Sequence, residues 1–83
     1  MSTVREQIST RYRLERLVKS GQARQLRESA RFSCIQVADR LGVSPATVTR
    51  WELGQRTPRG RLLSRYVRLL DEMEAAIKEN GHG

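Results

Sequence analysis

The stretch from Phe32 to Gly54 constrains the fold of this chain most, because it carries two sets of helix-boundary signals around a tight turn. Ser33 is a helix cap, since its hydroxyl can accept a hydrogen bond from the amide of Gln36 while the Gln36 side chain bonds back to the Ser33 amide. The first helix is predicted to end at Leu41, because Gly42 supplies the positive φ that a chain leaving a helix often needs.

A second helix is predicted from Pro45, which takes the first helical position, where a missing amide hydrogen costs nothing. Ser44 caps this helix and Gly54 closes it. Val48 and Trp51 lie three residues apart and give it one buried face. Two helices joined through a short turn with a Gly form a helix-turn-helix, although a plain helical hairpin in a bundle uses the same turn. The residues left facing outward are Pro45, Ala46, Thr49 and Arg50.

The segment from Ala23 to Arg61 resembles the phage repressor and Cro family of helix-turn-helix domains, most clearly in LRESARFSCIQVADRLGVSPATVTRWELGQRTPRG. The resemblance covers roughly half of the chain, and it implies a regulator whose second motif helix enters the major groove of double-stranded DNA. There are two departures from the family. Cys34 stands where a Gln is usual, and Pro45 and Ala46 replace a polar pair that often reads bases.

Arg50 is the strongest candidate for reading a base, because a guanidinium can bind guanine O6 and N7 through two hydrogen bonds. Thr47 and Thr49 can bond to neighbouring base edges, and the methyl group of Ala46 can contact a thymine methyl. The predicted base-reading face is therefore Ser44, Pro45, Ala46, Thr47, Thr49 and Arg50.

The loop between Gly54 and Leu62 is rich in arginine, and Thr57 is predicted to cap a helix that begins at Pro58. Helix-start amides and arginines can hold phosphates on either side of the groove. We interpret Cys34 as a small residue near the DNA backbone, with redox sensing as the alternative. The predicted phosphate contacts are Ser33, Cys34, Gln36, Arg56, Thr57, Arg59 and Arg61.

A preceding helix is predicted from Gln22 to Ala30, after a break at Ser20 and Gly21. Arg27 lies on its inward stripe, where a charge needs a partner. The family resemblance supplies that partner, Glu52, and gives the pair a structural role. A surface arginine that extends past the core is the alternative.

The charge of the chain is positive and unevenly placed. Lys and Arg number 16 against 9 acids, giving +7; residues 1–68 hold 15 bases and 5 acids, whereas residues 69–83 hold 1 base and 4 acids. A small basic domain favours a polyanionic partner. Charge alone does not show whether that partner is DNA, RNA or an anionic membrane. A chain this short is also marginally stable alone, so a homodimer is a reasonable expectation.

Residues 3–19 are predicted to form a helix in addition to the family's core, with Val4, Ile8 and Tyr12 at four-residue steps. Its bases suggest an arm that contacts DNA. Its apolar residues suggest instead a helix docked on the core or on a dimer partner, and we slightly favour docking. The bases are Arg5, Arg11, Arg13, Arg16 and Lys19.

The helix predicted to begin at Pro58 is long, and from Leu62 to Glu79 it carries an apolar stripe wider than one core contact needs. We expect its first half to close the DNA-binding domain and its second half, from Leu69, to meet the N-terminal helix or a second protomer. The chain is thus predicted to be an all-α bundle of five helices: an N-terminal basic helix at 1–19, a helix-turn-helix DNA-binding domain at 20–68, a C-terminal helix extension at 69–80 that can serve dimerisation, and a disordered tail at 81–83.

The function expected from these features is sequence-specific binding of double-stranded DNA by a Cro-like, phage-type repressor that occupies a promoter. A DNA-binding antitoxin that buries its C-terminal stripe against a toxin, or a helical protein-interaction module, are the alternatives. With one cysteine, Cys34, a lone histidine, His82, and no cluster of chemical groups, we expect no enzyme, metal, cofactor or small-molecule ligand. With no signal-peptide pattern and no long apolar run, we expect a cytoplasmic protein without membrane contact.

Overall fold

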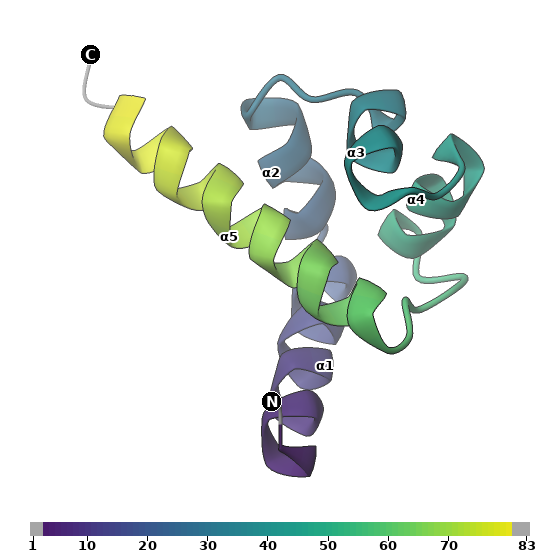
Figure 1. The fold of residues 1–83 in the computed structure, drawn as a ribbon. Coiled ribbons are helices and arrows are strands. Elements are labelled where there is room, and N and C mark those ends of the chain that lie inside the picture. Colours follow the sequence, from purple (N-terminus) through teal and green to yellow (C-terminus); the bar gives the residue numbers. More distant parts are fainter. Residues whose placement is uncertain (1–2, 81–83) are drawn as a thin grey trace.

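A computed structural model describes residues 3–80 of the protein, and these residues form five α-helices. Figure 1 shows their order and arrangement: α1 (Val4–Lys19), α2 (Gln22–Ser29), α3 (Cys34–Leu41), α4 (Pro45–Glu52) and α5 (Arg61–Asn80). The described residues contain no strand, so the predicted all-α class is confirmed. The predicted disordered tail at 81–83 lies outside the described residues.

The ends of α3 and α4 agree with the predicted capping signals. The Ser33 hydroxyl accepts a hydrogen bond from the Gln36 amide at 3.1 Å, and the Ser33 amide donates to Gln36 Oε1 at 2.8 Å. Gly42 takes a φ of +70°, which turns the chain out of α3, and the Ser44 hydroxyl accepts from the Thr47 amide at 3.2 Å. Because each signal acts within a few residues, the sequence was sufficient to locate this turn.

A single apolar core receives side chains from all five helices. α3 packs against α4, while α5 lies across α1 and α2 and also contacts α3. The α5 helix is continuous from its start to its end, and its second half contributes to the same core as its first half. The buried core residues are Leu14, Ala23, Val37, Ala38, Leu41, Val48, Trp51, Leu63, Tyr66, Val67, Leu69, Leu70 and Met73.

The start of α5 differs from the prediction. The helix begins at Arg61, so Thr57 caps no helix and Pro58 lies in an irregular segment, where its ring is buried. Gly60 has a left-handed φ of +58°, which separates Pro58 from the helical backbone that follows. The predicted phosphate-binding helix start at Thr57 is therefore wrong.

The first half of α1 does not meet one part of the favoured prediction, which was docking either on the core of its own chain or on a dimer partner. Val4, Ile8 and Tyr12 are 72%, 64% and 64% exposed, so they do not dock on the core of their own chain. The buried contact is made further along by Leu14, with Leu17 and Val18 packed beside it. Figure 1 shows that the N-terminal half of α1 extends beyond its crossing with α5, and there Val4 and Ile8 line a groove whose other wall includes Leu63 of α5.

Candidate nucleic-acid interface

The α4 helix is held by one face and presents the other to solvent. Val48 and Trp51 are buried, and the Trp51 ring lies 4.9 Å from the ring of Tyr66 on α5 at an interplanar angle of 42°. A tilted aromatic pair at this separation adds to the stabilisation from burial. The outward residues of the helix and its cap are exposed, except that Thr47 is partly covered; they are Ser44, Pro45, Ala46, Thr49 and Arg50.

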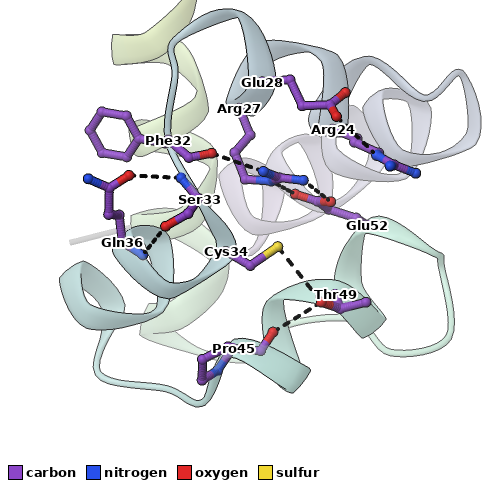
Figure 2. A network of polar contacts seen from close by, with 10 residues as sticks. All are labelled: Arg24, Arg27, Glu28, Phe32, Ser33, Cys34, Gln36, Pro45, Thr49 and Glu52. Carbon is purple, nitrogen blue, oxygen red and sulfur yellow. Dashed lines mark hydrogen bonds and ion pairs between the residues drawn. The ribbon is translucent and has the colours of Figure 1, made fainter.

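The hydroxyl groups on this face bond within the protein. Ser44 Oγ and Thr47 Oγ1 are 2.8 Å apart. Thr49 Oγ1 donates to the carbonyl oxygen of Pro45 at 3.2 Å and lies 3.7 Å from Cys34 Sγ, a contact between α4 and α3 that Figure 2 shows. These hydroxyls are therefore oriented before any ligand arrives.

Arg50 differs from its neighbours because its guanidinium forms no hydrogen bond or ion pair with any of residues 3–80, whereas its backbone is fully engaged. The Arg50 carbonyl oxygen accepts hydrogen bonds from the amide of Gln55 at 2.9 Å and from the amide of Arg56 at 3.3 Å. The loop after α4 is thus tied to the residue whose side chain faces outward.

An ion pair between α2 and α4 fixes the orientation of the motif. Arg27 Nη2 donates to Glu52 Oε1 at 3.1 Å while Nε donates to Oε2, and Arg27 Nη1 donates to the carbonyl oxygen of Phe32 at 2.9 Å (Figure 2). The two side chains are only 13% and 6% exposed. The hydrogen bond to Glu52 raises the pKa of Arg27 above its usual value, so the Arg27 guanidinium stays charged throughout the ordinary pH range.

Tyr66 lies beneath this network. Burial, followed by the charge of Glu52, raises the pKa of its hydroxyl above the usual value. That hydroxyl is buried and has no hydrogen-bond partner among residues 3–80. The position of Tyr66 next to the ion pair could not be predicted from the sequence, because nothing local links residues so far apart in the chain.

The groups expected to bind phosphate lie at two places in the structure. Ser33, Cys34 and Gln36 form the first turn of α3, where the Ser33 and Gln36 side chains are exposed and Cys34 is half-buried. The second set is the loop between α4 and α5 and the first residue of α5, and its side chains are exposed: Arg56, Thr57, Arg59 and Arg61. None of these three arginines has an ion-pair partner within residues 3–80.

Together these parts form a helix-turn-helix with a solvent-facing second helix and basic groups beside it, which is the arrangement of a DNA-binding domain. Comparison with known families matches residues 20–79, more than half of the chain, to the helix-turn-helix domain. The chain belongs to the helix-turn-helix domain family, and it is a DNA-binding protein of the regulatory kind. No curated protein and no solved structure matched the chain in the corresponding searches.

Within residues 3–80, no group of three or more His, Cys, Asp and Glu side chains is placed to hold a metal ion. No helix in the described part of the chain is both long and apolar enough to cross a lipid bilayer.

Proposed function

We propose that the protein is a sequence-specific, Cro-like repressor that binds an operator in double-stranded DNA with α4 in the major groove. The observation that carries the proposal is the exposed face of α4 from Pro45 to Arg50, with the unpaired guanidinium of Arg50 in the last turn of the helix. Arg50 reads a guanine through two hydrogen bonds, a contact worth about 1–3 kcal/mol of discrimination against other bases.

The α4 side chains other than Arg50 contribute less to base reading, because the hydroxyl groups among them already bond within the protein. Thr49 already donates to Pro45, so toward DNA its oxygen acts as an acceptor. Pro45 and Ala46 offer only apolar contact, such as with a thymine methyl. Sequence-dependent shape of the DNA then supplies specificity at positions that no side chain touches.

Phosphate contacts on both sides of α4 set the register. The amides of the first turn of α3 lie on one side, and Arg56, Arg59 and Arg61 lie in the loop on the other. If about four to six phosphates are neutralised, the logarithm of the association constant falls against the logarithm of salt concentration with a slope near −0.9 per phosphate.

Selection of bound sites from a random duplex library tests the proposal. We expect the wild type to yield a motif with at least one strongly required G, and Arg50→Ala to lose the requirement at that position while retaining the rest. Lys78→Ala is the matched control, since it also removes one positive charge but lies in the last turn of α5. Binding that yields no motif, or a motif unchanged in Arg50→Ala, would contradict base reading by Arg50.

The antitoxin alternative needs a C-terminal stripe that is free to receive a toxin. Leu69, Leu70 and Met73 are buried in the chain's own core, so the observed fold offers much less of that stripe than the alternative requires. A pure interaction module predicts no binding to duplex DNA, and the selection experiment measures that binding when it is repeated at low and high salt.

A further inference from the structure

The first three turns of α1 carry the most exposed large apolar side chains within residues 3–80. Val4, Ile8 and Tyr12 are 72%, 64% and 64% exposed, and they follow one another at four-residue steps. Successive residues of a helix differ by about 100°, so residues four apart lie on nearly the same side of it. Exposed apolar residues that gather in one place, instead of being scattered singly, indicate a binding surface.

These side chains form one wall of a trough that consists of two hollows. The larger hollow, of about 610 Å³, lies between α1 and the start of α5, with Val4 and Ile8 on one side and Leu63 on the other. The smaller hollow, of about 310 Å³, lies between Tyr12 and the loop that follows α4. Pro58 lines both hollows, so they meet at its ring. We call the two hollows together the α1 trough.

The borders of the α1 trough are basic. Three arginine or lysine side chains line the larger hollow and three line the smaller, six in all, against one acid, Glu15. Glu15 Oε1 lies 3.8 Å from Arg11 Nε, and both side chains are more than half exposed, so this pair contributes little. The other bases come from both walls and form no ion pair within residues 3–80; they are Arg16, Lys19, Arg56, Arg59 and Arg61. The trough is therefore an apolar channel between positive borders.

An apolar channel with positive borders fits one kind of partner best. DNA phosphates can bind the borders, but they would place charged groups over Ile8 and Tyr12. A protein segment that is both apolar and acidic suits the channel and its borders together. Along α1 the trough runs from Val4 to Val18, a length of about 21 Å at 1.5 Å of rise per residue, which matches a helix of about 14 residues. Such a helix is marginal alone and becomes stable when its apolar face lies in a groove.

We propose that the α1 trough binds a short, acidic, amphipathic helix of another protein. The apolar face of that helix lies against Ile8 and Pro58, and carboxylates along its two sides pair with the bases of α1 and of the loop. The expected phosphate contacts Arg56, Arg59 and Arg61 are among these bases, so the helix competes with DNA for them. A protein that carries such a helix releases this chain from its operator. The docking is independent of the proposed function, whereas the competition rests on it.

The described part of this chain offers no helix of that kind to a second copy. The C-terminal half of α5 is acidic, but Leu70 and Met73 on it are buried in the core of its own chain. Arg65 and Arg68 are exposed on the same helix and would be repelled by the borders of the trough. The partner is therefore a different protein.

The first test is a selection from a displayed library of random peptides of about 15 residues, with the full chain as bait and no DNA present. We expect the enriched peptides to carry acids on both sides of one apolar helical face. Amide chemical shifts of the protein then locate the most enriched peptide, and we expect the changes to concentrate in residues 4–19 and 54–64. No enrichment, enriched peptides without acids, or shift changes on the outward face of α4 would overturn the proposal.

The second test separates the apolar channel from its borders. Ile8→Ser removes an apolar contact and Arg16→Ala removes a charge, and we expect each to raise the dissociation constant of the selected peptide at least about fivefold. Ile35→Ser and Lys78→Ala are the matched controls, because Ile35 is 61% exposed on α3, Lys78 lies in the last turn of α5, and neither lines the trough. Far-ultraviolet circular dichroism checks that all four variants are folded. The proposal fails if Ile8→Ser binds the peptide as tightly as the wild type does.

Binding of duplex DNA and molar mass identify the other occupants. We expect Ile8→Ser and Arg16→Ala to bind DNA as the wild type does, with the same dependence on salt, and the peptide to displace DNA from the wild type. Weaker DNA binding by Ile8→Ser would place DNA in the trough, and a lower molar mass of Ile8→Ser would place a second copy there; either result contradicts the proposal. A peptide that binds beside DNA would refute the competition. If the repressor proposal fails, peptide binding without DNA still reports on the docking.

Discussion

Among residues 3–80, two arginine–carboxylate pairs connect different helices, and their surroundings differ. Arg27 and Glu52 are 13% and 6% exposed, and Arg27 also donates to the Phe32 carbonyl. Arg13 and Asp71 are 51% and 41% exposed and bond only to each other. A buried pair leaves an uncompensated charge when one partner is removed, whereas water solvates an exposed survivor. The same chemistry is therefore structural in one place and nearly dispensable in the other.

Breaking the buried pair has the largest expected effect. Glu52→Gln removes the negative charge at nearly constant shape and leaves the Arg27 guanidinium buried beside a neutral amide. We expect the free energy of unfolding to fall by about 3–5 kcal/mol. Urea denaturation measures it, and an unchanged melting temperature would show that the pair does not stabilise the motif.

Replacing both Arg27 and Glu52 separates the effect of a stranded charge from the effect of losing the pair. Arg27→Met combined with Glu52→Leu removes both charges and fills the site with apolar side chains. We expect this double variant to recover most of the stability lost by Glu52→Gln, since buried pairs often give way to apolar residues without net loss. A shortfall of about 1–3 kcal/mol should remain, because the Phe32 carbonyl oxygen loses its donor. A double variant no more stable than Glu52→Gln would mean that the charges themselves are required.

Alkaline pH probes Tyr66 beside the buried pair. Its pKa is raised in the folded protein, so above about pH 10 the unfolded chain releases the tyrosine proton while the folded chain retains it. Stability from this group is complete below that pH and is lost as the pH rises, by up to about 1.4 kcal/mol per pH unit. We expect Tyr66→Phe to lose stability less steeply than the wild type between about pH 10 and pH 12. Denaturation at several pH values measures it, and parallel curves would contradict it.

The exposed pair should give the smallest effect. Asp71→Asn is the counterpart of Glu52→Gln, and we expect it to cost about 0–1 kcal/mol and to cost less still at high salt. Denaturation in low and high salt tests this. A loss as large as that of Glu52→Gln would remove the distinction between the two pairs.

Features set by residues close together in the sequence could be predicted, whereas features set by packing between distant residues could not. Ser33, Gln36 and Gly42 act on neighbours within one turn, so the turn between α3 and α4 was predictable. Pro58 also carries a local helix-start signal, but the left-handed φ of Gly60 interrupts the helix two residues later, and the burial of the proline ring depends on the folded chain. The exposure of Val4 and Ile8 depends on where α5 crosses α1, which no local pattern encodes.

The candidate site likewise has features that the sequence predicts and features that only the packed structure shows. The outward position of Arg50 follows from helical spacing relative to Val48 and Trp51, as the sequence indicates. The contact of Thr49 with Cys34 and the bond from Arg27 to Phe32 join residues on different elements, and only the packed structure brings those atoms together.

The carbonyl oxygen of Arg50, which holds the amides of Gln55 and Arg56, has a consequence for retargeting the protein. The backbone at Arg50 links α4 to the loop that carries Arg56 and Arg59, and no side chain of the outward face takes part in this link. The outward side chains can therefore be exchanged as a library while the loop keeps its position on the DNA backbone. Such variants can change the base pairs that α4 recognises without moving α4 relative to the loop.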